Sequence, residues 1–243
     1  VIALYKQSQF VSLEGFHCHI GSQVFEESSF IKTIDVMSDF IKKIEDRYDI
    51  AIKALNLGGG FGVYYTDGDA AIDIKSMCQS IVQKVEEKIR SEALHIKTLY
   101  IEPGRSITAN AGVTLYTIGY TKETYGGKNY VFIDGGMSDN IRPALYQASY
   151  SCDIATNMNE HKKGHYTVAG KLCESGDIII NDTSLQPFDK GDILAVYATG
   201  AYNYSMASNY NRMLKPAVVF VKNGETEVVV KRETLEDLVR NDC

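Results

Sequence analysis

Hydrophobic residues in the first half of the chain recur at the spacing of amphipathic helices. One series advances in steps of four and three residues, namely Phe30, Ile34, Met37, Ile41, Ile44 and Tyr48. A second series has similar spacing, namely Ile74, Cys78, Ile81, Val85 and Ile89. Side chains three or four positions apart lie on one face of a helix. The pattern therefore predicts two helices, the first with Ser28 or Ser29 as its N-cap, and residues 1–6 look like the end of another helix.

Short apolar runs alternate with these two helices. They cover residues 11–20, 52–57 and 98–102, and each stops at glycine or proline, the second of them at Gly58–Gly62. The resulting order is strand, helix, strand, helix, strand. Such an order is typical of βαβ units, so we expect a parallel sheet in this part of the chain.

The pattern changes after residue 112 and becomes mainly strand-like. The strand-like runs are residues 113–120, 129–134, 165–168, 192–199, 216–222 and 225–231. Asn223-Gly224 between the last two predicts a tight hairpin turn. A helix is predicted only near the end, over Glu233–Arg240. We therefore predict an α/β domain over residues 1–112 and a mainly β domain with a short terminal helix over residues 113–243.

The first of these domains is small for a βα barrel. A complete barrel needs eight strands and about 250 residues, whereas residues 1–112 contain three predicted βα strands. The segment is thus either a small open α/β sheet or the back portion of a barrel. The chain begins with Val1-Ile2 rather than methionine, so we expect it to be part of a longer protein.

Composition narrows the classes of function. The chain has 243 residues, 44% hydrophobic and 23% charged, with a net charge of −6. This acidic balance offers no basic surface for nucleic acid, and no apolar run approaches the roughly 18 residues of a membrane span. The five cysteines are scattered without CxxC pairs. That pattern argues against a disulfide framework and favours a reducing cytoplasm.

Polar or glycine-rich segments follow each predicted βα strand, where parallel folds bind ligands. Gly58–Gly62 matches no common nucleotide loop, because Val63 stands where GxGxxG requires glycine. Its backbone N–H groups could bind a phosphate, helped by the N-terminus of a following helix and by the hydroxyl of Ser22. His17 and His19 lie two positions apart and could bind a metal, or one of them could pack on a planar cofactor. Since a zinc site needs further ligands, we expect no metal.

Glu102 and Cys173 each have two interpretations. Glu102 could simply pair with Arg105, or it could hold a proton on a heteroaromatic nitrogen and make that ring an electron sink. A cysteine beside an acid is usually a packed thiol. Cys173, however, lies in a predicted turn with Glu174 and Asp177, so a reactive role is credible.

Taken together, these segments resemble the fold-type III pyridoxal-phosphate-dependent amino-acid decarboxylases. The matching pieces occur in the family's order and cover nearly the whole chain: Gly15–Gln23, Leu57–Gly62, Ile101–Ser106, Met137–Tyr146, Cys173–Asp177 and Gly200–Met206. The resemblance implies the C-terminal part of an alanine-racemase-like (β/α)8 barrel followed by a β domain. Arg-Pro-Ala-Leu-Tyr and Cys-Glu-Ser-Gly-Asp are most similar to the branch that decarboxylates meso-2,6-diaminopimelate to L-lysine.

The resemblance also implies the cofactor, pyridoxal 5′-phosphate, and the residues that bind it. His19 would stack on the pyridine ring, and Glu102 would face the ring nitrogen. The remaining cofactor contacts would come from Ser22, Gly59, Gly60, Gly104, Arg105 and Tyr202.

For the substrate, the resemblance implies that Arg105, Arg142 and Tyr146 bind the retained carboxylate end. Tyr202 would touch substrate as well as cofactor. Cys173 would donate a proton and Glu174 would contact substrate, both in the active site of a neighbouring subunit of a homodimer.

One element of the family pattern has no counterpart here. The lysine that binds the cofactor covalently precedes the histidine strand in the family, and no lysine of this chain matches it, Lys6 included. We therefore expect the chain alone to be inactive. The alternatives left open are an ornithine- or carboxynorspermidine-type polyamine-pathway decarboxylase, a non-catalytic pyridoxal-phosphate-binding relative, and a metal-dependent barrel hydrolase using His17 and His19.

Overall fold

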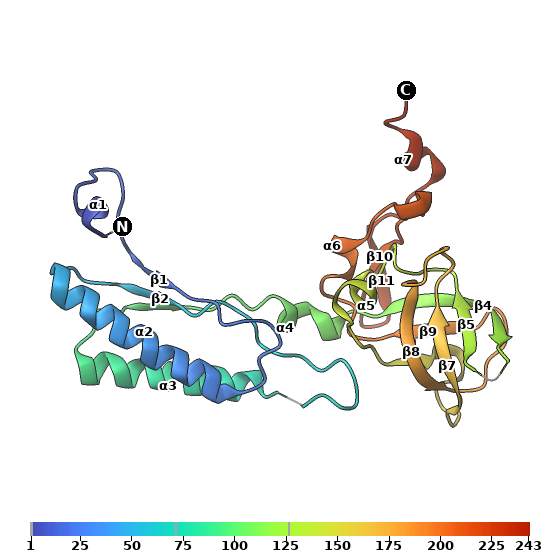
Figure 1. The fold of residues 1–243 in the computed structure, drawn as a ribbon, viewed down its shortest axis with the longest axis horizontal. Helices are drawn as coiled ribbons and strands as arrows, with labels where there is room; N and C mark the ends of the chain where they lie inside the picture. The colour runs from blue at the N-terminus through green and yellow to red at the C-terminus, as the bar shows by residue number, and fades with distance from the viewer. Residues whose placement is uncertain (1, 71, 126) are drawn as a thin grey trace. The chain divides into compact units, whose positions relative to one another are not determined.

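A computed structural model describes residues 2–70, 72–125 and 127–243 (Figure 1). By its internal contacts the chain divides into two compact units. Unit 1 runs to Tyr64 and from Asp69 to Ile107, and unit 2 comprises Tyr65–Gly68 and Thr108–Cys243. The domain boundary that the sequence predicts, between residues 112 and 113, stays a prediction.

Unit 1 has the predicted alternation of strands and helices. Its elements are α1 (Ile2–Lys6), β1 (Gly15–His17), α2 (Glu27–Tyr48), β2 (Ala54–Asn56), α3 (Ile74–Glu92), β3 (Thr98–Tyr100) and the start of α4 (Arg105–Thr108). The three strands form a parallel sheet in the order β1-β2-β3. The predicted parallel sheet and both long helices are confirmed.

The strands of this sheet are shorter than the apolar runs that predicted them. Each ladder pairs only three residues, for example Gly15 with Ala54 and Ala54 with Thr98. The predicted strand over residues 11–20 is therefore wrong outside Gly15–His17, and Glu102 lies in a loop after β3. The predicted N-cap of α2 is also wrong, because Ser28 and Ser29 lie inside the helix and Glu26 is the N-cap residue.

The core of unit 1 lies between its helices and the middle strand. Phe30, Ile34 and Ile41 of α2 are fully buried, as is Leu55 of β2. The ring of Phe30 stacks on that of Phe61, with centroids 4.7 Å apart. The apolar faces that the spacing predicted are thus the buried faces, and both helices run alongside the sheet in Figure 1.

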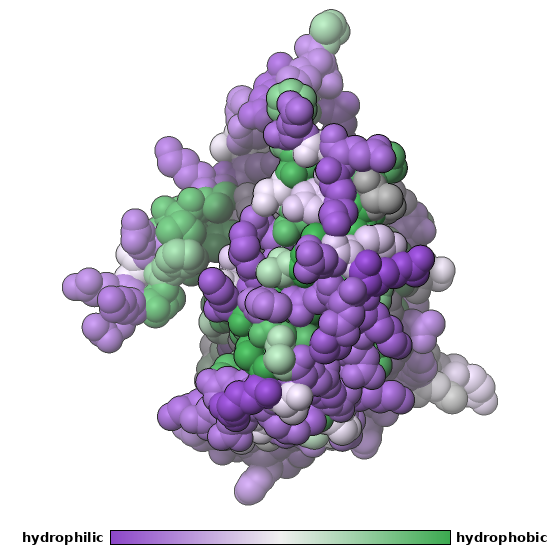
Figure 2. Space-filling model, turned by 90° about the vertical axis from the view of Figure 1, so that its left-hand side faces the viewer, coloured by the Kyte–Doolittle hydropathy of each residue, from purple (hydrophilic) through white to green (hydrophobic). Residues whose placement is uncertain are grey.

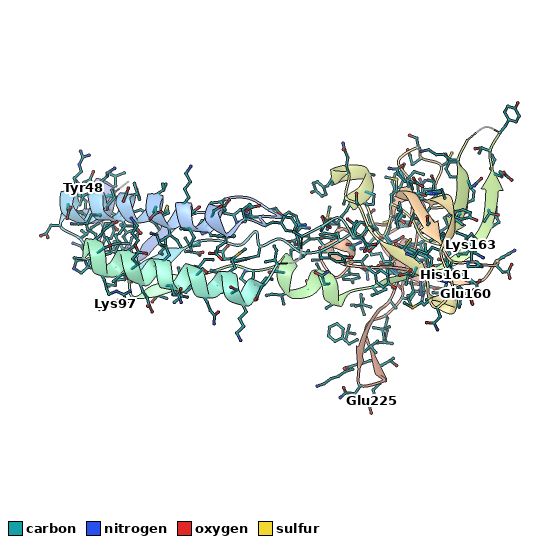
Figure 3. The ribbon with its side chains drawn as sticks, turned by 90° about the horizontal axis from the view of Figure 1, so that it is seen from below. Tyr48, Lys97, Glu160, His161, Lys163 and Glu225 are labelled. Carbon is teal, nitrogen blue, oxygen red and sulfur yellow. The ribbon has the colours of Figure 1, made fainter. Side chains whose placement is uncertain are left out.

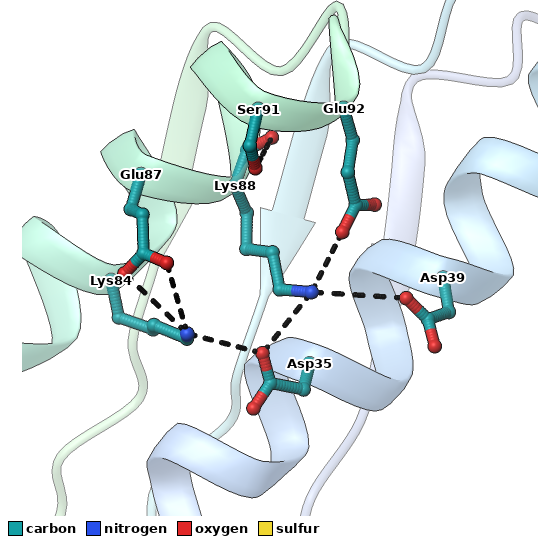
Figure 4. A network of polar contacts seen from close by, with 7 residues as sticks. All are labelled: Asp35, Asp39, Lys84, Glu87, Lys88, Ser91 and Glu92. Carbon is teal, nitrogen blue, oxygen red and sulfur yellow. Dashed lines mark hydrogen bonds and ion pairs between the residues drawn. The ribbon is translucent and has the colours of Figure 1, made fainter.

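An ion-pair network, drawn in Figure 4, joins α2 to α3. The ammonium of Lys88 lies 2.7 Å from Glu92, 3.2 Å from Asp35 and 3.8 Å from Asp39. Lys84 lies 3.3 Å from the same Asp35 carboxylate. The hydrogen bond to Glu92 raises the pKa of Lys88. The network therefore fixes the two helices side by side and keeps their buried faces in register.

Unit 2 is a six-stranded sheet with short helical turns. Its strands follow the order β6-β9-β4-β5-β7-β8, antiparallel except between β5 and β7. The strands are β4 (Thr114–Glu123), β5 (Asn129–Ile133), β6 (Cys152–Ile154), β7 (Lys163–Ala169), β8 (Ile178–Leu185) and β9 (Ile193–Val196). The short helices are η1 (Ala109–Ala111), α5 (Arg142–Tyr146), η2 (Ala155–Asn157), α6 (Asn203–Met206), η3 (Tyr210–Arg212) and α7 (Leu235–Val239). The mainly β character is confirmed, whereas β6 and β8 were missed.

A separate hairpin of β10 (Val218–Lys222) and β11 (Glu225–Val230) projects from unit 2, with Glu225 near its tip in Figure 3. Its turn is the predicted one, since Asn223 and Gly224 have φ of 54° and 82°. Phe220 and Val221 of β10 are 64% and 71% exposed. Hydrophobic residues reach the surface elsewhere too, as the green areas of Figure 2 show. Within the described residues, no helix is both long and apolar enough to cross a membrane.

Candidate functional site

The polar segments after β1, β2 and β3 come together in unit 1. Backbone hydrogen bonds extend beyond the strands, from Cys18 N to Asn56 O at 2.9 Å and from Glu102 N to Gly58 O at 2.7 Å. These bonds align the three strand ends. The predicted gathering of the histidine segment, the glycine loop and Glu102 at one edge of the sheet is therefore present in the structure.

Glu102 is oriented by the end of β2. Its Oε1 accepts a hydrogen bond of 2.7 Å from Asn56 Nδ2, and His17 Nδ1 lies 3.6 Å from the same oxygen. Asn56 Oδ1 in turn accepts from Gly58 N at 2.8 Å. Asn56 was missed in the sequence, although it stands directly before the glycine loop. The carboxylate is 55% exposed, so it is accessible to a ligand while its direction is fixed.

His19 is held by the glycine loop. Its Nδ1 accepts a hydrogen bond of 3.2 Å from Gly59 N, which leaves Nε2 as the protonated nitrogen of a neutral ring. Glycine is required in the loop by close backbone approach. A Cβ on Gly59 would lie 2.1 Å from the carbonyl oxygen of Glu102, and one on Gly60 would lie 2.0 Å from that of Gly21.

The phosphate-binding role of the glycine loop stays a prediction. The N–H groups of Gly58 and Gly59 already donate to Asn56 and His19. The next helix, α3, begins only at Ile74, so its N-terminus does not follow the loop directly. Ser22 and Arg105 are further groups beside the loop that could contact an anion.

Arg105 and Ser22 form the cationic side of this cluster. Arg105 Nη2 donates to Ser22 Oγ at 2.9 Å. Arg105 also begins α4, directly after Pro103-Gly104. A guanidinium, a hydroxyl, an accessible carboxylate and an oriented imidazole together suit a ligand that has both a phosphate and a heteroaromatic ring. In the described part of the chain, no three His, Cys, Asp or Glu side chains are arranged to bind a metal.

Unit 2 contains a buried arginine at the start of α5. Arg142 is only 6% exposed. Its Nη1 donates to Tyr65 Oη at 3.0 Å and to the carbonyl oxygen of Ala201 at 3.1 Å. Its guanidinium carbon lies 5.5 Å and 5.8 Å from the ring centroids of Tyr65 and Tyr202. Arg142 was predicted, whereas Tyr65 was missed.

The charge of Arg142 is not neutralised within its own unit. Among the described residues, no ion pair includes Arg142, and its buried Nε has no hydrogen-bond partner. An unneutralised buried cation is costly. A ligand anion would offset this cost. The nearby rings of Tyr146, at the end of α5, and of Tyr202 are exposed.

The segment with Cys173 and Glu174 is shaped by Asp177, which is 2% exposed. Asp177 Oδ1 accepts from Met137 N at 2.6 Å, and its Oδ2 accepts from Leu172 N at 2.7 Å. The thiol of Cys173 is exposed.

Glu174 lies at the surface beside Tyr210. Its carboxylate accepts a hydrogen bond from Tyr210 Oη, which raises the pKa of that phenol. Tyr210 was missed in the sequence because a tyrosine outside any motif carries no distinguishing pattern.

The chain is similar to known pyridoxal-dependent decarboxylases. Residues 1–109 match the pyridoxal-binding domain of the pyridoxal-dependent decarboxylases. The chain is 48% identical over 236 residues to the diaminopimelate decarboxylase of Bacillus subtilis, covering 97% of this chain and 54% of that protein. It is 47% identical over 238 residues to the same enzyme of Staphylococcus aureus, covering 98% of this chain and 55% of that protein. The chain thus spans about half the length of these relatives.

Solved structures also match the whole of this chain with about half of their own length. Diaminopimelate decarboxylase from M. jannaschii, crystallised with L-lysine, superposes with a TM-score of 0.92 at 34% identity. The match covers 100% of this chain and 54% of that chain. The fold is therefore similar to that of about half of this enzyme.

Proposed function

Since the chain is homologous to about half of the pyridoxal-dependent diaminopimelate decarboxylases, we propose that it forms the C-terminal part of such an enzyme. The intact enzyme would convert meso-2,6-diaminopimelate to L-lysine and CO2 in the cytoplasm. The observation that carries this proposal is the buried Arg142, whose charge has no counterion among the described residues of its unit. A ligand carboxylate would supply that counterion.

The groups of unit 1 fit pyridoxal 5′-phosphate. When bound, this cofactor supplies an electron sink for the carbanion left by loss of CO2. Glu102, oriented by Asn56, would hold the proton of the ring nitrogen. His19, fixed by Gly59, would pack on the ring. Phosphate contacts would come from Ser22 and Arg105, with Gly59, Gly60 and Gly104 allowing close approach and Tyr202 adding a further contact.

The groups of unit 2 fit the two ends of the substrate. Arg142 binds the retained carboxylate, because a guanidinium grips a carboxylate through two parallel hydrogen bonds. Tyr146 and Arg105 assist at this end, and Tyr202 contacts substrate as well as cofactor. Glu174, oriented by Tyr210, contacts an amino group of the substrate.

Cys173 is the group that returns a proton to the substrate carbon after CO2 leaves. Its thiol is exposed and lies beside Glu174 in a loop that Asp177 holds. We place Cys173 and Glu174 in the active site of a second subunit, so that the enzyme is a homodimer with shared sites.

The function is tested by incubating the purified intact enzyme with cofactor and meso-diaminopimelate. L-lysine and CO2 are expected, with much slower turnover of ornithine and carboxynorspermidine, which offer no distal carboxylate to Arg142. Equal turnover of ornithine would favour a polyamine-pathway decarboxylase. The 243-residue chain alone should be inactive, since no lysine here matches the cofactor-binding lysine of the family.

The shared site is tested with two inactive variants of the intact enzyme. One carries Cys173→Ser, which raises the pKa of the donor and slows protonation while leaving cofactor absorbance unchanged. The other lacks the cofactor-binding lysine. Mixing them should restore part of the activity, because some heterodimers contain one site with both groups. No recovery after proven subunit exchange would place Cys173 in the site of its own subunit or outside catalysis.

A further inference from the structure

Tyr65 lies in a short segment that interrupts unit 1 in the sequence but belongs to unit 2 by its contacts. It follows Gly62 by three positions, yet Tyr65–Gly68 belongs to unit 2. Its carbonyl oxygen accepts from Ser151 Oγ at 2.9 Å. Its ring packs edge-to-face on Tyr150, with centroids 5.6 Å apart at 84°. Both the backbone and the ring of Tyr65 are therefore fixed before any ligand binds.

This fixed ring holds the guanidinium of Arg142 in two ways. Tyr65 Oη accepts the 3.0 Å hydrogen bond from Nη1, and the ring lies below the guanidinium carbon at 5.5 Å. The other acceptor of Nη1 is the carbonyl oxygen of Ala201. Both acceptors are uncharged. They orient the cation without neutralising it, whereas a carboxylate in place of Tyr65 would compete with a ligand.

We propose that Tyr65 is a positioning residue that orients Arg142 for the carboxylate of the substrate. An unrestrained arginine has many rotamers, and ordering it during binding lowers affinity. Tyr65 removes that cost and keeps the positive charge available. The inference rests on the proposed function, in which Arg142 binds the retained carboxylate, and adds a residue that no motif of the sequence identifies.

The test compares two probes in the intact, cofactor-loaded enzyme. L-lysine has the retained carboxylate, and L-lysinamide is the same molecule with a neutral amide in its place. Calorimetric titration should show that Tyr65→Phe weakens L-lysine binding about tenfold, as expected for loss of a hydrogen bond to a charged group. Binding of L-lysinamide should be unchanged. With meso-diaminopimelate, KM should rise while kcat stays nearly constant.

Tyr197→Phe is the matched control. Tyr197 also lies in unit 2, with a partly buried hydroxyl that hydrogen-bonds Asp153, and we assign it no role in binding. The ratio of the two affinities should be unchanged in this variant. In an Arg142→Met background, Tyr65→Phe should no longer change the ratio, because the group that Tyr65 orients is gone.

The outcomes separate this inference from the proposed function. If wild type binds L-lysine no better than L-lysinamide, Arg142 is not a carboxylate site and both proposals are wrong. If wild type discriminates but Tyr65→Phe leaves the ratio unchanged, or weakens both probes equally, Tyr65 has only a structural role. A further effect of Tyr65→Phe on the ratio in the Arg142→Met background would also overturn the inference.

Discussion

Arg105 and Arg142, the two arginines assigned to ligand binding, are held in opposite ways. In unit 1, Arg105 bonds to the exposed hydroxyl of Ser22, near a Glu102 side chain that is 55% exposed. In unit 2, Arg142 is 6% exposed and lies against Tyr65, itself 7% exposed. Water screens the first cluster until a ligand covers it, whereas the second is already desolvated. The proposed cofactor cluster is therefore assembled on a surface, whereas the proposed carboxylate site is already formed without a ligand.

The difference follows from the local architecture of each unit. Strand ladders of three residues end in loops, so the polar groups of unit 1 extend beyond the sheet. Arg142 instead begins a helix, and its guanidinium is buried where it donates to Tyr65 and Ala201. Burying the Arg142 guanidinium without a counterion lowers the stability of the fold. Such a loss is expected at a functional site, where the cation would bind an anion.

The largest expected effect is on the glycine loop of unit 1. Phe61→Ala removes a ring that is 1% exposed and stacks on Phe30, so it should cost about 3–5 kcal/mol of unfolding free energy. Hydrogen exchange should rise in α2 and β2 while β4 and β9 stay protected. Phe220→Ala in the exposed hairpin should change stability by less than about 0.5 kcal/mol. Equal deprotection of both units would show that they unfold as one.

The second effect separates binding from stability at Arg142. Arg142→Met should reduce transition-state binding of diaminopimelate by about 2–4 kcal/mol in the intact enzyme, measured as kcat/KM. The thermal midpoint should not fall, because an apolar side chain of similar length replaces an unneutralised buried cation. A fall in the midpoint with unchanged kcat/KM would make Arg142 a structural residue.

The helices of unit 1 could be predicted because their burial follows sequence spacing. Phe30, Ile34 and Ile41 are spaced so that they all lie on the buried face of α2. Strand β8 could not be predicted, because Asn181-Asp182 interrupts its run of apolar residues and leaves no regular pattern. Its place comes from pairing with β7, which only the tertiary structure determines.

The site residues divide in the same way. His19, Glu102 and Arg142 lie in motifs whose composition already indicates chemistry. Asn56 and Tyr65 act through hydrogen bonds to residues 46 and 77 positions away. No local pattern reports such distant partners, so these two residues became visible only in the structure.

The third effect concerns a buried anion in unit 2 that does have partners. Asp177→Ala removes the acceptors of Met137 N and Leu172 N, so it should cost about 1.5–3 kcal/mol of unfolding free energy. Hydrogen exchange should rise around Cys173. Asp182→Ala, whose side chain is 72% exposed beside His165, should change stability by less than about 0.5 kcal/mol. A loss no larger than in this control would mean that Asp177 does not hold the loop.

The smallest effect is a difference in pH dependence between two partly buried carboxyl groups of unit 2, those of Asp139 and Asp153. Burial raises the pKa of Asp139, although Tyr116 Oη and Gly136 N donate to it, and the charge of Asp177 acts in the same direction as burial. The folded pKa lies above the unfolded one, so its contribution to stability is present at low pH and is lost as pH rises through the folded pKa. Asp153 has the opposite shift. Burial opposes the change, but Lys162 and Gln186 outweigh it and lower the pKa.

Denaturant unfolding from pH about 3.5 to 7.5, around the ordinary aspartate pKa, distinguishes these signs. The stability of Asp139→Asn relative to wild type should increase with pH, because the variant removes a charge that costs free energy when ionised. For Asp153→Asn the relative stability should decrease with pH, because that carboxylate stabilises the fold only when ionised. Parallel curves for wild type and Asp139→Asn would mean that this partly buried carboxyl group keeps an ordinary pKa.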